Sequence, residues 1–426
     1  MFERPDAGER AVLVHLELMT ESEREDPQEF KELVISAGVE PVALVQGSRA
    51  HPSPRFFVGE GKLEEVKEAI SLHEADVVLF NHALSPSQER NLERELKCRV
   101  LDRTGVILDI FAQRARTYEG KLQVELAQLE HMSTRLIRGW THLERQKGGI
   151  GLRGPGETQL ETDRRLLRAR IKYIGKRLEK VRTQRDQGRR ARQRAEIPTV
   201  SLVGYTNAGK STLFNRITEA QVYAANQLFA TLDPTLRRIT LPDIGPVVLA
   251  DTVGFIRHLP HKLVEAFRAT LEETENADLL LHVVDSNSFE REDNMRQVEE
   301  VLIEIGADEI PTLVVYNKID LLEGRGPGIV RDSDGKPLAV WLSAQTGEGI
   351  PMLFAAISEL LARNMVHKTV RLPPNLGRLR AMLYQNGSVV HEGASEDGSL
   401  VLEVRLPRSD WQQMLSRVGV REEALV

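Results

Sequence analysis

Short apolar runs alternate with amphipathic stretches along the first 112 residues of the chain. The runs have the length of buried strands, and the stretches between them carry apolar residues at helical spacing. Strands are predicted at Ala11–Leu18, Pro41–Val45, Asp76–Phe80 and Val100–Asp102, and helices at Gln28–Ala37, Leu63–His73 and Pro86–Leu96. This alternation predicts an N-terminal α/β domain, residues 1–112, around a mostly parallel sheet.

Between residues 113 and 196 the apolar residues are spaced 4,3,4,3 instead. One series is Leu122, Leu126, Leu129, Ser133, Leu136, Trp140 and Leu143, and a second is Leu160, Arg164, Leu167, Ile171, Ile174, Leu178 and Val181. Two such heptad-like seams predict an antiparallel helical hairpin, although each seam has one polar member. The glycine-rich residues 147–157 cannot continue a helix, so they predict a mobile tip that carries Lys147 and Arg153. A plain flexible connector is the alternative.

Buried strands and helices alternate again over residues 197–365. The strands are predicted at Thr199–Val203, Val247–Ala250, Leu279–Val284 and Thr312–Tyr316. They predict a second α/β domain, with a mostly parallel sheet covered by helices on both faces. In a small α+β domain, residues 366–426, strands are expected at Val370–Leu372, Ser388–Val390 and Val401–Val404 and a helix at Arg408–Arg417.

Charge is distributed unevenly along the chain. The net charge of −6 comes from 57 Lys and Arg against 63 Asp and Glu, yet Arg164–Arg194 alone holds fourteen bases and two acids. A dense basic segment in an otherwise acidic protein indicates contact with a polyanion. A solvated helix face is the alternative.

Targeting and redox signals are sparse. A single cysteine, Cys98, excludes an intrachain disulfide. The first ten residues are charged, so we expect no signal peptide, and every apolar run is far shorter than the roughly 20 residues of a membrane span. These features favour a cytoplasmic protein, with peripheral membrane association as a second option.

Gly204-Tyr-Thr-Asn-Ala-Gly-Lys-Ser211 matches the phosphate-binding pattern G-x-x-x-x-G-K-[ST]. It follows a predicted strand and precedes Thr212–Thr218, a predicted helix, which is the context that this pattern requires. The glycines allow backbone N–H groups to surround the phosphates. Lys210 would place its charge at the β- and γ-phosphates, and the Ser211 hydroxyl would bind Mg²⁺.

Three further segments follow in order, each at the carboxyl end of a predicted strand. Asp251-Thr-Val-Gly254 offers a carboxylate for Mg²⁺ and a Gly254 N–H for the γ-phosphate. Asn317-Lys-Ile-Asp320 offers the Asp320 carboxylate to the two N–H donors of guanine, a pair that adenine lacks. Ser343-Ala-Gln345 offers a backbone N–H to the guanine O6. Ligands bind at this edge of open α/β sheets, so the segments together predict a GTP site.

The segment Leu228–Thr235 offers Thr231 and Thr235 as the threonine that closes on Mg²⁺ and the γ-phosphate. We prefer Thr231, because its surroundings resemble the F-x-T-L-x-P pattern of a related GTPase group. An ordinary loop hydroxyl is the alternative for either residue.

Two residues bear on hydrolysis. Phe255 stands where a glutamine orients the attacking water in Ras-like enzymes, and phenylalanine cannot do so, which predicts slow intrinsic hydrolysis. Asn207 resembles the asparagine that helps to coordinate K⁺ in potassium-stimulated relatives. The alternative is that Asn207 only tolerates the turn geometry.

The candidate site residues fall into three overlapping sets. Catalytic roles are predicted for Lys210, Thr231, Gly254 and Asn207, and Mg²⁺ ligation for Ser211, Thr231 and Asp251. Nucleotide contacts are predicted for Gly204, Tyr205, Thr206, Asn207, Ala208, Gly209, Lys210, Ser211, Phe229, Ala230, Thr231, Leu232, Asp233, Asp251, Thr252, Val253, Gly254, Asn317, Lys318, Ile319, Asp320, Ser343, Ala344 and Gln345.

Four further segments are distinctive: Phe57-Val-Gly-Glu-Gly-Lys62, Asp102-Arg-Thr-Gly105, Ile107-Leu-Asp-Ile-Phe111 and the glycine-rich loop Gly148–Glu161. They resemble the signatures of one family, the HflX GTPases of the Obg/Era/TrmE-like translation-factor group. A second phosphate loop at Gly59–Lys62 is less probable than a turn into a helix, because Leu63 stands where Ser or Thr is needed, although ATP binding by this domain is described for the family.

The resemblance implies a ribosome-associated GTPase that binds the 50S subunit and splits stalled or idle 70S ribosomes. It implies Mg²⁺ as cofactor, K⁺ as an optional second cation, and rRNA as the polyanion met by the basic helix and the glycine-rich loop. A monomer is expected. An rRNA-remodelling ATPase and a GTP-dependent protein switch are the alternatives, but no helicase motif supports the first and no sequence feature the second.

Overall fold

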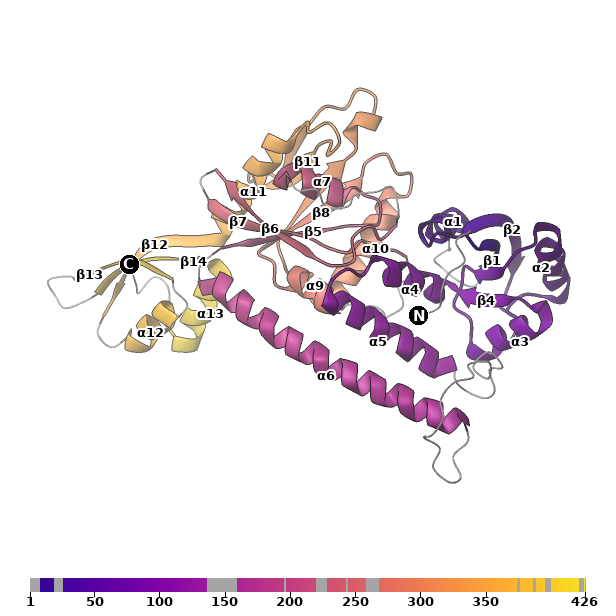
Figure 1. Ribbon diagram of the computed structural model, residues 1–426. Coiled ribbons are helices and arrows are strands. Elements are labelled where there is room, and N and C mark those ends of the chain that lie inside the picture. The colour runs from indigo at the N-terminus through magenta and orange to yellow at the C-terminus, as the bar shows by residue number, and fades with distance from the viewer. Residues whose placement is uncertain are drawn as a thin grey trace. The chain divides into compact units, whose positions relative to one another are not determined.

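Figure 1 shows the computed structural model, which describes residues 8–18, 26–135, 159–194, 197–219, 228–242, 244–257, 268–373, 376–385, 388–394, 400–420 and 425. The chain divides into two compact units. Unit 1 comprises Met1–Val181, Ala225–Asp233 and Ile256–Ala269, and unit 2 comprises Arg182–Ala224, Pro234–Phe255 and Thr270–Val426.

A sheet of four parallel strands forms the N-terminal part of unit 1. The strands are β1 (Arg10–Leu18), β2 (Glu40–Arg49), β3 (Val77–Phe80) and β4 (Arg99–Asp102), in the order β2-β1-β3-β4. The helices are α1 (Pro27–Ser36), α2 (Glu60–His73), α3 (Pro86–Leu96) and α4 (Arg103–Arg114). The predicted βα alternation and parallel sheet are confirmed, and α4 is an element that the apolar pattern did not predict.

Polar residues explain where these helices begin. Asp26, Ser85 and Asp102 are the N-cap residues of α1, α3 and α4, and each side chain accepts a hydrogen bond from a backbone N–H of the first turn. Gly59 precedes α2 without a side-chain cap, and Lys62 Nζ lies 2.6 Å from a Glu65 oxygen. The segment Gly59–Lys62 is therefore a turn into a helix, as expected.

The helices α5 (Tyr118–Arg135) and α6 (Gln159–Arg194) form the predicted pair. Arg170 donates two hydrogen bonds to Glu125, of 2.7 and 3.0 Å, and the Arg177 guanidinium lies 5.4 Å from the Tyr118 ring centroid. Residue numbers in these pairs rise along α5 as they fall along α6, so the helices are antiparallel. The first seam from Leu136 onward and the glycine-rich tip, 147–157, lie outside the described residues.

Seven strands form the sheet of unit 2, in the order β10-β11-β9-β8-β5-β7-β6. They are β5 (Thr199–Val203), β6 (Thr235–Leu241), β7 (Gly245–Asp251), β8 (Leu279–Asp285), β9 (Thr312–Asn317), β10 (Gly328–Arg331) and β11 (Pro337–Trp341). The helices are α7 (Lys210–Thr218), α9 (Arg268–Glu275), α10 (Arg291–Glu304) and α11 (Ile350–Asn364), with a short 3₁₀ helix at Ile319–Leu321. All pairings are parallel except those of β6 and β10 at the two edges, so the mostly parallel sheet is confirmed.

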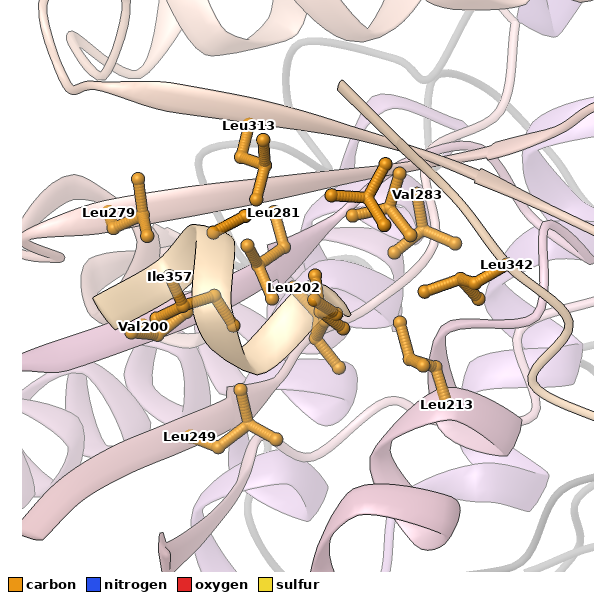
Figure 2. Close-up of a cluster of buried hydrophobic side chains, with 14 of the residues drawn as sticks. Val200, Leu202, Leu213, Leu249, Leu279, Leu281, Val283, Leu313, Leu342 and Ile357 are labelled. Atoms are coloured by element: carbon orange, nitrogen blue, oxygen red, sulfur yellow. The ribbon is translucent and has the colours of Figure 1, made fainter. Parts of the chain in front are cut away.

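The core of unit 2 explains why the central strands read as continuous apolar runs. Every residue of β5 is buried, as are Leu279–Val284 of β8, which is the pattern of strands covered on both faces. Figure 2 shows Leu202 and Leu281 from these strands beside Leu213 of α7 and Ile357 of α11 in one apolar cluster.

A three-stranded antiparallel sheet ends the chain. Its strands β12 (Met365–Leu372), β14 (Leu400–Pro407) and β13 (Val389–Ala394) lie in that order, with α12 (Gly377–Gln385) and α13 (Arg408–Val418). Trp411 of α13 is fully buried in its core. The predicted α+β class is confirmed. Within the described part of the chain, no helix is both long enough and apolar enough to cross a membrane.

His282 in β8 makes the stability of unit 2 sensitive to acid. The side chain is 3% exposed, and burial, followed by the positive charge of Lys210, lowers the pKa of His282 to about 4. Because this pKa is depressed below its unfolded value near 6.5, the unfolded chain binds the proton more readily. The stability that neutral His282 contributes is fully present above pH 6.5 and is lost as the pH falls towards 4.

We expect this histidine to remove about 2 kcal/mol of stability between pH 7.5 and pH 5. Urea unfolding of the wild type and of His282→Leu at both pH values measures the effect. The variant should lose less stability on acidification by that amount, and equal losses in the two proteins would contradict the assignment.

Candidate nucleotide-binding site

Residues Gly204–Ser211 form a tight loop between β5 and α7. A Cβ on Gly204, whose φ is +146°, would lie 2.2 Å from the Val283 carbonyl oxygen. Gly209 has φ +95°, and a Cβ there would lie 2.2 Å from Asn317 Nδ2. Gly209 precedes α7 without a side-chain cap, and the N-terminus of a helix favours an anionic ligand such as a phosphate.

Lys210 lies inside this loop. Its Nζ donates hydrogen bonds to the carbonyl oxygens of Gly204, at 2.9 Å, and Tyr205, at 2.7 Å. Burial lowers the pKa of Lys210 to about 8, against the opposing effect of the Asp251 carboxylate. The ammonium group is thus held at the loop by two uncharged carbonyl acceptors that an anionic ligand could replace.

Ser211 and Asp251 meet at the end of β7. The Ser211 Oγ donates a hydrogen bond of 2.8 Å to Asp251 Oδ2, and the Asp251 side chain is fully buried. A hydroxyl and a carboxylate side by side are the hard oxygen donors that Mg²⁺ prefers. The donor set therefore fits this cation.

Residues Gly254 and Phe255 approach the loop closely. A Cβ on Gly254 would lie 2.9 Å from Thr206 Cγ2 and 3.1 Å from Lys210 Nζ. The Phe255 carbonyl accepts a 2.7 Å hydrogen bond from Thr206 N, and its N–H donates to Gly204 O at 3.1 Å. The Phe255 ring is 1% exposed, so it cannot orient a water molecule.

Asn317 links three segments of the site. Its Nδ2 donates to the Ala208 carbonyl at 2.9 Å, and its Oδ1 accepts from Ala344 N at 2.9 Å. The Asn317 side chain is 2% exposed. The phosphate-binding loop is thereby joined to the segments after β9 and β11.

Neighbouring contacts order the Asn317–Asp320 segment. Lys318 has φ +69° and its Nζ lies 2.7 Å from Asp285 Oδ2, while the Ser343 hydroxyl donates to the Asp320 carboxylate. The Asp320 carboxylate is therefore fixed where β9 and β11 end, at the carboxyl edge of the sheet.

Arg216 of α7 is a residue of this site that sequence reasoning missed. Its Nε donates to the Ala344 carbonyl at 3.2 Å, and its Nη2 donates to the Gln345 carbonyl. A single arginine on a helix forms no motif. Its position six residues after Lys210, on the helix that begins at the phosphate-binding loop, is the signal that could have indicated it. Arg216 holds the backbone that the sequence assigns to guanine.

The predicted residues Phe229–Asp233 lie in unit 1, whereas all other predicted site residues lie in unit 2. The Phe229 ring packs edge-on against Phe111, with centroids 4.7 Å apart. Thr231 is buried, and Asp233 accepts hydrogen bonds from Arg116 and Thr117. Thr235, the second threonine considered, begins β6 in unit 2.

Four family descriptions match consecutive parts of the chain. They are GTP-binding GTPase N-terminal (residues 24–112), GTP-binding GTPase Middle Region (114–192), 50S ribosome-binding GTPase (199–318) and HflX C-terminal domain (328–425).

Relatives match over nearly the whole length. A GTPase HflX of Escherichia coli strain K12 is 65% identical over 97% of this chain and 97% of its own. A GTPase HflX of Magnetococcus marinus is 48% identical over 95% and 94%. Among solved structures, a GTP-binding protein from the archaeon Sulfolobus solfataricus in complex with GDP is similar over 83% of this chain and 99% of its own, at 26% identity and a TM-score of 0.44.

Replacing Arg216 by methionine should weaken GDP binding about fivefold, because two hydrogen bonds from an exposed side chain to the backbone of Ala344 and Gln345 are worth about 1 kcal/mol together. Stopped-flow dissociation of a fluorescent GDP analogue measures the change, which should appear as faster release. Arg331→Met, which removes an exposed ion pair with Glu359 in the same unit, is the matched control. Equal release rates for the two variants would refute the role of Arg216.

Proposed function

We propose a function from the premise that this chain belongs to the HflX family of GTPases. It is a GTP-binding protein that hydrolyses GTP. The proposed task is to bind the 50S ribosomal subunit in the cytoplasm and to split stalled or idle 70S ribosomes. The observation that carries the proposal is the hydrogen-bonded assembly of guanine nucleotide motifs in unit 2, within the stretch that matches 50S ribosome-binding GTPases.

The phosphates of GTP would lie at the N-terminus of α7. Lys210 would exchange its two carbonyl partners for β- and γ-phosphate oxygens, which raises its pKa again because the phosphates are anionic. Mg²⁺ would be held by Ser211, Thr231 and Asp251, and it would supply neutralisation of charge on the phosphates. The paired oxygens of Ser211 and Asp251 support this assignment.

The guanine base would be read at the other end of the site. The Asp320 carboxylate would accept both N–H donors of guanine, and a backbone N–H of Ser343–Gln345 would donate to O6. The support is geometric. Ser343 and Asp320 are hydrogen-bonded to each other, and Asn317 joins their segments to the phosphate-binding loop Gly204–Ser211.

Hydrolysis would depend on groups other than a glutamine. The Gly254 N–H and Thr231 would contact the γ-phosphate, and Phe255 cannot activate water because its side chain has no hydrogen-bonding group and is buried. Asn207, with φ +61°, would use its side-chain oxygen for K⁺ beside the phosphates. Slow basal turnover and acceleration by the ribosome follow from this arrangement.

Ribosomal RNA would meet the helical hairpin, residues 113–196, together with the N-terminal domain, residues 1–112. The helix α6 has 36 residues, which corresponds to about 54 Å. Lys172, Lys176 and Lys180 are exposed along one side of it. Bases at i, i+4 and i+8 form a line of charge that matches a phosphate backbone.

Reversing the charge of this line should separate ribosome binding from nucleotide binding. We expect the triple variant K172E/K176E/K180E to lose most of the 50S-stimulated GTPase activity. The slope of the logarithm of the 50S binding constant against the logarithm of salt concentration should fall in magnitude by about three. GTP hydrolysis is measured with and without 50S subunits, and subunit release from 70S particles is followed by light scattering.

The variant R296E/R325E/K336E is the matched control, because it makes the same change in net charge at exposed basic residues outside the hairpin and the N-terminal domain. It should retain stimulation and splitting. Ribosomes that fail to stimulate the wild type would overturn the proposed function. The same assay in K⁺ and in Na⁺ buffer tests Asn207, since only K⁺ should support full activity.

Asp320→Asn should lower GTP affinity about 100-fold, since two charge-assisted hydrogen bonds to guanine are lost at a cost of about 3 kcal/mol. The same change should improve binding of xanthosine nucleotides, whose N1–C2 edge offers a carbonyl to the amide. Competition against a fluorescent GDP analogue measures both affinities. An unchanged preference for GTP would remove Asp320 from the guanine site.

A further inference from the structure

The segment Leu228–Asp233 is fastened to the rest of unit 1 at both of its ends. At the first end, Leu228 N donates a buried hydrogen bond of 3.0 Å to Ser36 Oγ, and the ring of Phe229 is packed edge-on against Phe111. At the second end is the carboxylate of Asp233. All these residues belong to the same compact unit.

Both oxygens of Asp233 bind the start of α5. Oδ2 accepts hydrogen bonds from Arg116 N at 2.8 Å and from Thr117 N at 2.9 Å, and Oδ1 accepts from the Thr117 hydroxyl at 2.5 Å. The same hydroxyl accepts from Gly120 N at 2.9 Å, as the N-cap of the helix. A carboxylate at this position also interacts favourably with the helix dipole.

Gly120 is the residue that permits this approach. A Cβ on Gly120 would lie 2.0 Å from Asp233 Oδ1, so any other residue would force the carboxylate away. Glycine inside a helix costs about 1 kcal/mol relative to alanine. A residue that is unfavourable for the helix thus stands where Asp233 makes its contact.

Thr231 lies midway between the two fastened ends. It is two residues from Phe229 and two from Asp233, a separation of at most about 7 Å in an extended chain. While both ends hold, the Thr231 side chain can move only a little. Directly after Asp233, at Pro234, the chain passes into unit 2.

We propose that Asp233 is a positioning residue for the GTPase reaction, not a nucleotide ligand. Its bond to the N-terminus of α5 holds Thr231 in place for the γ-phosphate, and so couples the GTP-bound state to the helical hairpin. This proposal rests on the role of Thr231 given under the proposed function. If Asp233 is released, the segment Leu228–Asp233 must be ordered each time GTP binds, which weakens GTP binding. GDP binding does not use Thr231, so it does not carry this cost.

Gly120→Ala tests the contact from the opposite side, because alanine favours the helix but displaces Asp233. We expect Gly120→Ala and Asp233→Asn each to lower the preference for a non-hydrolysable GTP analogue over GDP about tenfold. The affinity of Gly120→Ala for GDP should stay within about twofold of the wild type. Gly175→Ala is the matched control, because Gly175 lies on α6 with no atom within 4 Å of its added Cβ.

Hydrogen exchange at the Arg116 and Thr117 amides gives a second readout on the full-length protein. In the wild type the GTP analogue should slow their exchange relative to GDP, and Gly120→Ala should abolish that difference. The proposal is overturned if Gly120→Ala behaves like Gly175→Ala, or if it weakens both nucleotides equally.

Thr231→Ala distinguishes this failure from failure of the proposed site. A threonine that contacts the γ-phosphate must itself lower the preference for the GTP analogue when removed. If Thr231→Ala leaves the preference unchanged, the assignment of Thr231 is wrong, and the proposal for Asp233 falls with it. If Thr231→Ala lowers the preference and Gly120→Ala does not, only the positioning role is wrong.

Discussion

The side-chain amide of Asn317 is the interaction that ties together the segments of the candidate nucleotide site in unit 2. Its two polar atoms are hydrogen-bonded to Ala208 O on the phosphate-binding loop and Ala344 N beyond β11. Rotation of this amide would leave two buried backbone groups unpaired, at about 1–3 kcal/mol each. Gly209 is part of the same constraint, because a side chain there would occupy the place of Asn317 Nδ2. One residue, together with the glycine that makes room for it, therefore sets the distance between the phosphate-binding loop and the segment at Ala344.

Much of the fold could be predicted because burial leaves a direct trace in the sequence. The central strands β5 and β8 are covered on both faces and appear as continuous apolar runs. The seam of α6 appears as 4,3 spacing because only one stripe of the helix packs, with Ile174 fully buried within it. The edge strands β6 and β10 were missed, since most of their residues are only partly buried or exposed and carry no apolar periodicity.

The candidate site likewise has residues that short sequence motifs predict and residues that only long-range contacts identify. The P-loop and the segments at Asp251, Asn317 and Ser343 could be found because each is a short motif that needs its own neighbours in the chain. The contacts of Arg216 and Asp233 join residues more than 100 positions apart, and neither residue type is unusual where it stands. Gly120 is a glycine near the start of a helix, which is unusual enough to be noticed in the sequence. Its role can be recognised only from the structure, where Asp233 lies beside it.

The most basic segment of the sequence lies on α6, the longest helix in the described part of the chain, and packing connects the two properties. In a heptad seam only two of seven positions face the partner helix, so five remain for solvent-exposed residues. On α6 these positions include Lys172, Lys176 and Lys180, and like charges four residues apart destabilise an isolated helix. The apolar seam and the pair between Arg170 and Glu125 must offset that repulsion for the helix to form. An anionic partner along the exposed side would relieve the same repulsion, so the charge distribution of the helix itself favours contact with a polyanion.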